Sequence, residues 1–201
     1  MISTVLDYGA GNVTSVARAL RRLGCEVRLT SRPNEIASAT CLILPGVGHS
    51  AALLGFLDTQ ALRQPLVDAL ARGTPFLGIC LGLQALYEQS EEAPGTPGLA
   101  VLRGQVSLLP PEVKLPHMGW NQLRASRRTR LLDGIPPEAY FYFAHSYAAP
   151  AGGPEAAATC FHGREFTAVL ESNRIFGVQF HPEKSGAPGA KLLENFLRLA
   201  A

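Results

Sequence analysis

Residues 74–86 read TPFLGICLGLQAL, and this stretch decides the predicted fold. The apolar run up to Ile79 is typical of a parallel strand that is buried on both faces. It ends at Cys80, which stands between Gly78 and Gly82. A side chain on a sharp turn from strand to helix needs such small neighbours, because the backbone reverses tightly around it. The stretch therefore predicts a strand, a turn with Cys80 at its tip, and a helix.

The first half of the chain repeats this alternation of strand and helix. We expect strands over residues 2–7, 25–30, 41–44 and 75–79, with helical segments over 13–24, near Pro33 and before Gly73. Four such units in succession predict a parallel sheet with helices on both faces.

The second half has a different rhythm, in which short strands are joined by turns. We expect strands over residues 105–109, 121–125, 139–144, 156–161, 166–172 and 174–180, with a hairpin turn at 171–174, a surface loop at 93–98 and a last helix over 190–200. The predicted fold is α/β, with a mostly parallel central sheet flanked by helices and an antiparallel β extension in the C-terminal half. A length of 201 residues fits a single domain over residues 1–201.

Composition excludes several classes of protein. The net charge is +2 with both signs interspersed, so no basic footprint for nucleic acid or an anionic membrane surface is expected. No apolar run is long enough to span a bilayer, and the start of the sequence lacks the pattern of a secretory signal, so we expect a cytoplasmic protein. The four cysteines show no metal-ligand spacing, and neither a metal site nor a cofactor is expected.

Cys80 is a candidate nucleophile. The helix expected after it would bring its N-terminal amides beside the sulfur and stabilise a thiolate. The amide of Leu81 would then point to where an oxyanion forms. A buried core cysteine beside two packing glycines fits this stretch equally well when it is considered alone.

A second motif, QFHPE at residues 179–183, favours the catalytic interpretation. His181 and Glu183 stand two residues apart, so in extended chain they share a face, and Pro182 fixes the backbone between them. A carboxylate placed there orients the imidazole as a general base. Cys80, His181 and Glu183 together make a thiol triad, provided that the sheet brings them together. A third motif, LPGVG at 44–48, is a glycine-rich turn on the same edge of the sheet, where a backbone amide can serve as a second oxyanion donor.

These motifs resemble the class I glutamine amidotransferase family, whose signature is a Gly-x-Cys-x-Gly-x-Gln elbow with a later His-x-Glu. The likeness is strongest to members that supply ammonia to a cyclase of histidine biosynthesis. It is carried by DYGAGN at 7–12, PGVG at 45–48, GICLGLQ at 78–84, PHMGWN at 116–121, FAHSY at 143–147 and FHPEKS at 180–185. Leu83 stands where methionine is frequent in the family, and Gly186 replaces the second serine after the lysine.

The resemblance implies a glutaminase that works through a thioester on Cys80, with L-glutamine as substrate. The implied oxyanion donors are the amides of Val47 and Leu81. The implied glutamine-binding residues are Gly46, Gly48, Gln84, Glu92, Ser146 and Tyr147. The residue types of PGVG also permit the Gly46–Val47 peptide to turn its amide away from Cys80 until the cyclase is bound with its nucleotide.

The implied partner is a (β/α)₈ cyclase subunit, which receives the ammonia in a heterodimer. The implied docking residues are Asn12, Ser15, Arg18, Trp120 and Lys184. Trp120 is a candidate interface residue independently of the resemblance. It is the only tryptophan, and it lies in a polar, glycine-containing stretch where it can anchor an interface. A core tryptophan is the ordinary alternative.

Three other functions stay open at this point. One is a different amidotransferase subunit, such as the glutaminase of pyridoxal phosphate synthase, which PGVG and PHMGWN disfavour. Another is a cysteine hydrolase or peptidase that acts alone. The last is a binding module in which Cys80 is only packed.

Overall fold

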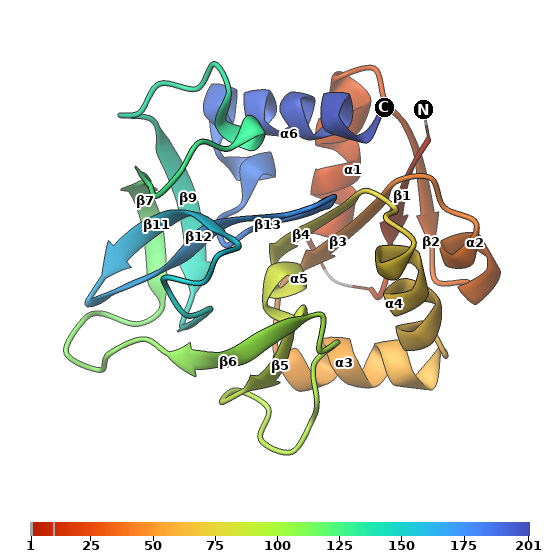
Figure 1. Cartoon of the computed structure of the whole chain (residues 1–201), viewed down its shortest axis with the longest axis horizontal. Helices are drawn as coiled ribbons and strands as arrows, with labels where there is room; N and C mark the ends of the chain where they lie inside the picture. The colour runs from red at the N-terminus through yellow and green to blue at the C-terminus, as the bar shows by residue number, and fades with distance from the viewer. Residues whose placement is uncertain (1, 10) are drawn as a thin grey trace.

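The computed structural model describes residues 2–9 and 11–201. Its described strands form one sheet of eight strands and two small sheets of three and two (Figure 1). The large sheet has the order β2-β1-β3-β4-β13-β12-β11-β8. These strands are β2 (Glu26–Thr30), β1 (Ile2–Leu6), β3 (Leu42–Gly46), β4 (Phe76–Cys80), β13 (Ile175–Val178), β12 (Arg164–Ser172), β11 (Ala156–His162) and β8 (Arg124–Ala125).

The first five strands of this order run parallel, and the last three pairings are antiparallel. The predicted α/β fold with an antiparallel C-terminal extension is therefore confirmed. The predicted hairpin turn is confirmed as well, since β12 and β13 pair from Ser172 and Ile175 onward, with Asn173 at a φ of 54° between them. The pairing of β13 with β4 matters most, because it brings a late strand beside the one that ends at Cys80.

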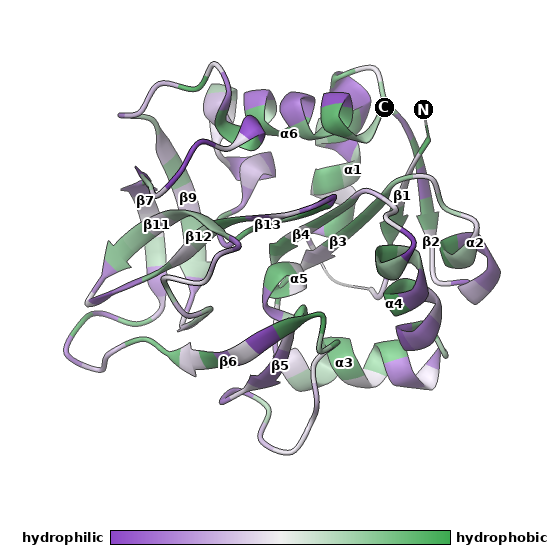
Figure 2. Cartoon of the chain, viewed as in Figure 1, coloured by the Kyte–Doolittle hydropathy of each residue, from purple (hydrophilic) through white to green (hydrophobic). Residues whose placement is uncertain are grey.

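Helices cover both faces of the large sheet (Figure 1). One face carries α1 (Val13–Arg22) and α6 (Gly186–Ala200), and the other carries α2 (Pro33–Ala37), α3 (Ser50–Thr59), α4 (Arg63–Ala71) and the single turn α5 (Leu81–Gln84). In α1, Val13, Val16 and Leu20 are buried, as helical spacing predicts, and the opposite side is polar (Figure 2).

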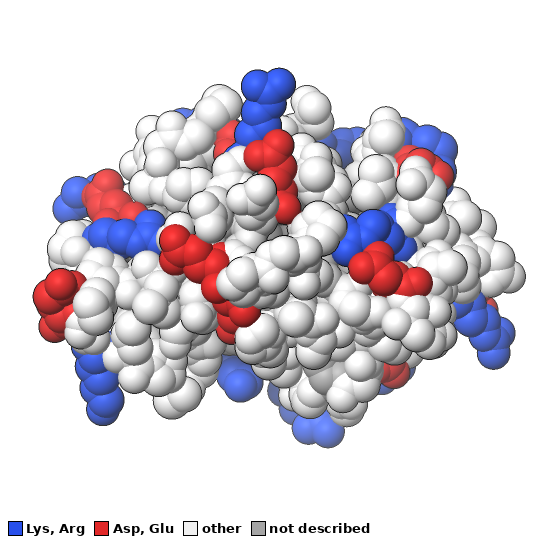
Figure 3. Space-filling view, turned by 90° about the horizontal axis from the view of Figure 1, so that it is seen from below, with Lys and Arg blue, Asp and Glu red and all other residues white. Residues whose placement is uncertain are grey.

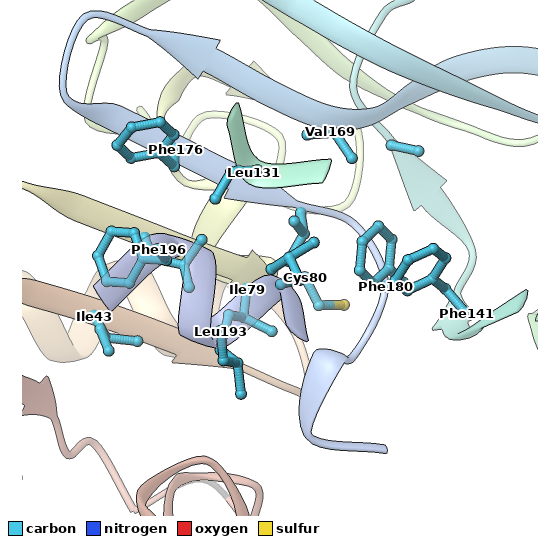
Figure 4. Packing of buried hydrophobic residues seen from close by; sticks show 14 of the residues in the cluster. Ile43, Ile79, Cys80, Leu131, Phe141, Val169, Phe176, Phe180, Leu193 and Phe196 are labelled. Carbon is cyan, nitrogen blue, oxygen red and sulfur yellow. The ribbon is translucent and has the colours of Figure 1, made fainter. Parts of the chain in front are cut away.

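Two apolar cores result, one on each side of the sheet. Val5, Ile43 and Ile79 point to the side of α1 and α6, where they meet Leu193 and Phe196 (Figure 4). Their strand neighbours point to the other side and pack under α3 and α4. The central parallel strands β3 and β4 are thus buried on both faces, which explains their continuous apolar sequences, whereas the edge strand β2 is largely exposed.

The smaller sheets contain the parts that sequence reasoning placed least well. They are formed by β5 (Tyr87–Ser90), β6 (Leu102–Leu108) and β10 (Tyr147–Ala148), and by β7 (His117–Gln122) and β9 (Tyr140–His145). Short 3₁₀ turns lie at η1 (Arg130–Leu132) and η2 (Pro182–Lys184).

Several elements differ from expectation in extent or were not expected. The strand expected over 121–125 is β7, which starts earlier at His117, followed by the separate short strand β8. The register of β7 against β9 explains this, because Trp120 lies opposite Tyr142 and the pairing overrides the loop-like Pro and Gly residues. The helix after Cys80 is only one turn long, and β5 follows it unpredicted. The last helix starts at Gly186 rather than at residue 190.

Three further properties of the described residues concern helix length, charge and metal-ligand clusters. None of their helices is long and apolar enough to cross a membrane. Acidic and basic side chains are interspersed on the face shown in Figure 3, without a large patch of one sign. Over residues 2–9 and 11–201, no cluster of three potential metal ligands is found.

Candidate active site

Cys80 stands on a strained elbow between β4 and α5. Its φ is 53° and its ψ is −105°, a positive-φ conformation that residues with a side chain rarely adopt. A Cβ added at Gly78 would lie 2.6 Å from the carbonyl oxygen of Gly82, and one added at Gly82 would overlap the carbonyl oxygen of Leu44 on β3. The two glycines are therefore required, as predicted, because backbone packs directly on backbone around the cysteine. Figure 4 shows the sulfur at the end of its strand, on the side of Phe180.

His181 and Glu183 form a buried pair. The Nδ1 atom of His181 donates to Oε1 of Glu183 over 2.9 Å, and the two side chains are 1% and 0% exposed. The predicted contact is present, but its origin differs from the extended chain that was expected. β13 ends at Val178, and Glu183 lies in the 3₁₀ turn η2, which begins at Pro182. A tight turn, rather than strand alternation, brings the carboxylate to the imidazole.

The sheet brings this pair to Cys80. β13 lies parallel to β4 with Val178 opposite Ile79, so the chain leaving β13 reaches the same edge as the elbow. Burial lowers the pKa of His181, but its interactions with Cys80 and Glu183 outweigh burial and raise this pKa to about 10. His181 thus holds a proton at neutral pH.

The alignment between the imidazole and the sulfur is loose. Nε2 of His181 is buried and has no hydrogen-bond partner of regular geometry among the described residues. Cys80 and His181 nevertheless line the same cavity, and Cys80 contributes to the raised pKa of His181, so the two side chains lie near each other. Contacts between catalytic groups are often long in the absence of substrate and tighten when it binds.

A cavity of about 310 Å³ opens beside Cys80. Its lining includes most of the residues that the sequence predicted for catalysis, the oxyanion hole and glutamine binding: Val47, Gly48, Cys80, Leu81, Gln84, Glu92, Ser146, Tyr147 and His181. Lys184, predicted for the partner interface, lines it too. Two predicted residues do not line it: Gly46 lies opposite Cys80 in the β3–β4 register, and Glu183 is bound to His181.

Glu92 is held at one end of this cavity. Its Oε2 atom accepts hydrogen bonds from the amide of Ser50 at 2.8 Å and from the hydroxyl of Ser50 at 2.5 Å. Ser50 is the first residue of α3, so the carboxylate also meets the positive end of that helix. These contacts fix the position of a negative charge on the cavity wall.

Sequence reasoning missed Gln179, which contacts the sulfur. Its Nε2 atom lies 3.5 Å from Sγ of Cys80, and its Oε1 accepts from Nε2 of Gln84 at 3.0 Å. The same Gln84 nitrogen donates to the carbonyl oxygen of Tyr147 at 2.7 Å. A fully buried glutamine at the end of an apolar strand was the available signal, because such an amide needs hydrogen-bond partners.

Two buried histidines stand behind the cavity wall. His145 lines the cavity, and its Nδ1 lies 2.9 Å from the carbonyl oxygen of Tyr147. Its Nε2 lies 3.1 Å from Nδ1 of His117. Burial lowers the pKa of His145 to about 3 and that of His117 to about 4, so both rings are neutral at neutral pH. The two rings thus support the backbone at Tyr147 through the His145 hydrogen bond, and they add no charge to the site.

The amide of Val47, predicted as an oxyanion donor, is bound elsewhere. It donates to the phenolic oxygen of Tyr8 at 2.8 Å, and that hydroxyl lies 3.1 Å from the carbonyl oxygen of Val47. Tyr8 was not singled out from the sequence. Leu81, the other predicted donor, directly follows the elbow and lines the cavity.

The predicted docking residues lie in or directly before α1, in β7 and in η2. Trp120 is 55% exposed, which contradicts the core alternative, and Ser15, Arg18 and Lys184 are exposed. The ring of Tyr142 joins the group, with Trp120 edge-on at 5.9 Å and the Lys184 ammonium at 5.6 Å. Asn12 is buried instead, and neither polar atom of its side chain has a hydrogen-bond partner among residues 2–9 and 11–201.

Comparison with known proteins agrees with this geometry. Residues 4–200 match the family model described as glutamine amidotransferase class-I. The HisH subunit of imidazole glycerol phosphate synthase from Methanothermobacter thermautotrophicus is 45% identical over 195 residues, covering 97% of both chains. The HisH subunit from Deinococcus radiodurans is 46% identical over 197 residues, covering 96% of this chain and 92% of its own.

Solved structures bear on the fold. A crystal structure of a glutamine amidotransferase superposes with a TM-score of 0.78 at 20% identity, covering 98% of each chain. The structure of PurLQS from Thermotoga maritima gives a TM-score of 0.77 at 20% identity, covering 98% of this chain and 97% of the other. On its sequence and its fold, the chain belongs to the class I glutamine amidotransferase family and, within it, to the HisH subunits of imidazole glycerol phosphate synthase.

Proposed function

We propose that Cys80, His181 and Glu183 carry the glutaminase activity of this subunit, which hydrolyses L-glutamine to glutamate and ammonia. The observation that carries the proposal is the strained elbow of Cys80, whose side chain lines the same cavity as His181 of the buried His181–Glu183 pair. A cysteine that is only packed needs neither the strain nor the charged pair, which argues against a binding module.

The reaction follows from the protonation of the pair. The Cys80 thiolate attacks the side-chain amide carbon of glutamine, and the carbonyl electrons move to oxygen. The tetrahedral intermediate collapses, the C–N bond breaks, and His181 gives its proton to the leaving nitrogen, so that ammonia departs. Water then attacks the γ-glutamyl thioester with His181 as general base, which releases glutamate and restores the thiol. Glu183 keeps the Nδ1 proton in place throughout.

The negative oxygen of the intermediate needs hydrogen-bond donors. The amides of Val47 and Leu81 are the proposed pair, because both residues line the cavity next to Cys80. Val47 can serve only after its amide leaves Tyr8.

The rest of the cavity supplies groups for the amino acid end of glutamine. The proposed binding residues are Gly46, Gly48, Gln84, Glu92, Ser146 and Tyr147. Glu92 is the residue suited to the α-ammonium group, because its charge is fixed by Ser50 and α3. Backbone amides near Gly48 and Ser146 suit the carboxylate.

Ammonia is useful only if it reaches an acceptor before it is lost. The names of the relatives imply a second subunit in the synthase, and we propose a (β/α)₈ cyclase that forms a heterodimer with this chain. The cyclase uses the ammonia to produce imidazole glycerol phosphate and aminoimidazole carboxamide ribotide in histidine biosynthesis. The proposed contact residues are Asn12, Ser15, Arg18, Trp120 and Lys184. Exposed Trp120 supports this surface, and so does the Asn12 amide, which is buried without a hydrogen-bond partner among the described residues.

The proposal also covers the number of domains, the cellular location and the absence of a cofactor. Residues 1–201 act as a single domain, and the reaction takes place in the cytoplasm without a metal or cofactor. Among the alternatives, the names of the relatives argue against the glutaminase of pyridoxal phosphate synthase. A hydrolase that acts alone is disfavoured by the engaged amide of Val47.

Covalent labelling tests the nucleophile. The complex with the cyclase is treated with a glutamine-mimicking electrophile, and the labelled cysteine is located by peptide mass spectrometry. We expect labelling at Cys80 that L-glutamine slows, and none in Cys80→Ser. Cys160→Ser is the matched control, because burial raises the pKa of the Cys160 thiol to about 12 and leaves it unreactive. Labelling that glutamine does not slow, or that persists in Cys80→Ser, would contradict the proposal.

A further inference from the structure

We propose that Asn121, His117 and His145 are positioning residues for the nucleophile, because they form one end of a hydrogen-bond chain whose other end is the sulfur of Cys80. This inference rests on the proposed glutaminase function and adds residues that act on its thiol from a distance. The name histidine chain is used below for these hydrogen-bonded residues in order: Asn121, His117, His145, the carbonyl group of Tyr147, Gln84, Gln179 and Cys80.

The histidine chain starts on the inner face of β7. β7 and β9 lie side by side as an antiparallel pair, with His117 opposite His145 (Figure 1). Both histidines are buried, whereas Met118 and Trp120 on the other face of β7 are exposed. The strand thus presents the proposed docking surface on one side and the two imidazoles on the other.

Packing fixes the planes of the two imidazole rings. The ring of His117 stacks against those of His162 and Phe143, with centroids 4.2 and 4.7 Å away. The ring of His145 packs against that of Phe166 at 5.0 Å. Because the rings have little freedom to rotate, their nitrogen atoms keep fixed directions.

The Asn121 amide has its orientation fixed by two backbone groups. Its Oδ1 atom accepts from the amide of Gln122 at 2.8 Å, and its Nδ2 atom donates to the carbonyl oxygen of Phe161 at 3.1 Å. The second hydrogen on Nδ2 is left for Nε2 of His117, which lies 3.3 Å away. That imidazole nitrogen must accept, so the proton of His117 is on Nδ1.

The position of the proton on His145 follows from both of its neighbours. Nδ1 of His117 donates to Nε2 of His145 over 3.1 Å. Nδ1 of His145 lies 2.9 Å from the carbonyl oxygen of Tyr147, which can only accept. The two contacts independently require a neutral His145 with its proton on Nδ1. Burial lowers the pKa of His117 to about 4 and that of His145 to about 3, which agrees with two neutral rings.

The Tyr147 carbonyl links the histidines to two buried glutamines. It also accepts from Nε2 of Gln84 at 2.7 Å, and the other hydrogen on that nitrogen goes to Oε1 of Gln179 at 3.0 Å. With Oε1 engaged in this way, Gln179 turns its Nε2 toward Sγ of Cys80, which lies 3.5 Å away. Each member of the chain therefore has one favoured orientation, and the chain ends in a hydrogen-bond donor at the sulfur.

A donor at the sulfur favours the thiolate and fixes its direction of attack. If the Gln179 amide were reversed, its oxygen would face the sulfur and repel a thiolate. The contact with Gln84 opposes this reversal, and Gln84 in turn depends on the Tyr147 carbonyl. A buried polar chain whose members are all satisfied is rigid, so the two histidines act on the nucleophile through the glutamines.

His145→Phe tests the chain, because it keeps an aromatic ring beside Phe166 and removes both nitrogen contacts. Glutamate release by the complex with the cyclase is measured under steady-state conditions. We expect kcat to fall about tenfold, as loss of a buried hydrogen bond implies, while KM stays within about twofold. His162→Phe is the matched control: it keeps a ring stacked on His117 and loses a contact outside the chain, with the carbonyl oxygen of Lys114, so kcat should not change. An unchanged kcat in His145→Phe would overturn the inference.

A double-mutant cycle distinguishes one chain from two independent contacts. Gln179→Leu alone should lower kcat by about 10- to 100-fold. If His145 acts through Gln179, adding His145→Phe should lower kcat by less than about twofold more, because the chain is already broken. A double variant whose loss equals the product of the two single losses would overturn the inference, since the two residues would then act separately.

Nitrogen NMR gives a readout that depends neither on activity nor on the folding of a variant. The full wild-type chain is labelled with ¹⁵N-histidine, and the couplings between ring protons and ring nitrogens show which nitrogen carries the proton. We expect it on Nδ1 in both His117 and His145, whereas an unconstrained neutral histidine favours Nε2. A proton on Nε2 of either ring would overturn the chain. A wild-type complex that releases no glutamate would overturn the proposed function instead, and the proton positions would still test the chain.

Discussion

Nδ1 of His181 lies 2.9 Å from Oε1 of Glu183, with both side chains removed from solvent. Burial works against a charged imidazole, yet Cys80 and Glu183 raise the pKa of His181 from 6.5 to about 10. The raised pKa favours a protonated imidazole at position 181 in the folded state. Protonated His181 can donate its proton to the leaving ammonia, and its raised pKa makes the stability of the fold depend on pH.

The pH dependence of stability follows from this raised pKa. A histidine whose pKa is higher in the folded state stabilises the fold below its unfolded pKa, and this contribution is lost as pH rises through the folded pKa. We therefore expect the stability that His181 adds to be complete below pH 6.5 and to decline toward pH 10. Urea unfolding of wild type and His181→Gln at several pH values measures it. The difference in free energy of unfolding should be larger at pH 6 than at pH 10. A constant difference would contradict the charged state of His181.

Glu183→Gln tests the role of the carboxylate. The amide keeps the shape but no longer stabilises the imidazolium, so we expect glutamine-dependent synthesis to fall by about 10² or more. Synthesis from added ammonia should be unchanged in the same complex, since the cyclase is untouched. Glu165→Gln, on the exposed Arg124–Glu165 pair, is the control and should keep both activities. Equal losses from glutamine and from ammonia would indicate a damaged complex rather than a lost triad residue.

The elbow makes a prediction about stability. Gly82→Ala places a Cβ on the carbonyl oxygen of Leu44, so we expect it to reduce the free energy of unfolding by about 1–3 kcal/mol or more. Gly55→Ala is the matched change in α3, where no atom lies within 4 Å of the added Cβ. It should stabilise the protein by about 0.5–1 kcal/mol. Denaturant unfolding of both variants decides the matter, and similar effects at the two positions would contradict the backbone packing described above.

Gln179 is expected to position the thiolate. Its amide donates to the sulfur and accepts from Gln84, so Gln179→Leu removes both contacts. A hydrogen bond to a charged group contributes about 1.5–3 kcal/mol, which corresponds to about a 10- to 100-fold loss in kcat. Steady-state kinetics of the complex should show this loss in kcat with a smaller change in KM. A variant with lower stability but an unchanged kcat would show that Gln179 is only structural.

The elements that sequence predicted correctly are those whose signal is local. The parallel strands and α1 follow from apolar runs and helical spacing, and the elbow follows from Gly78, Cys80 and Gly82. The candidate triad was inferred from Cys80 between two glycines and from His181 and Glu183 two residues apart, and of its contacts the structure shows the one between His181 and Glu183. His181 reaches the edge of the sheet that carries Cys80 because β13 pairs with β4. The sequence alone did not determine this strand order.

The missed features depend on contacts between distant segments. β7 is a strand because Trp120 pairs opposite Tyr142, although its sequence resembles a loop. Gln179 looks like any polar residue until the fold places it against the sulfur. The Tyr8 hydroxyl binds the amide of Val47, which lies 39 residues further along the chain. Such relationships leave no local pattern in the chain.

The most direct test of the account is synthesis by the reconstituted complex with the cyclase, driven either by glutamine or by added ammonia. For Cys80→Ser we predict that the glutamine-driven rate falls by about 10³ or more while the ammonia-driven rate equals that of wild type. Cys160→Ser should retain both rates. Glutamine-driven synthesis that survives in Cys80→Ser would contradict the assignment of Cys80 as the nucleophile.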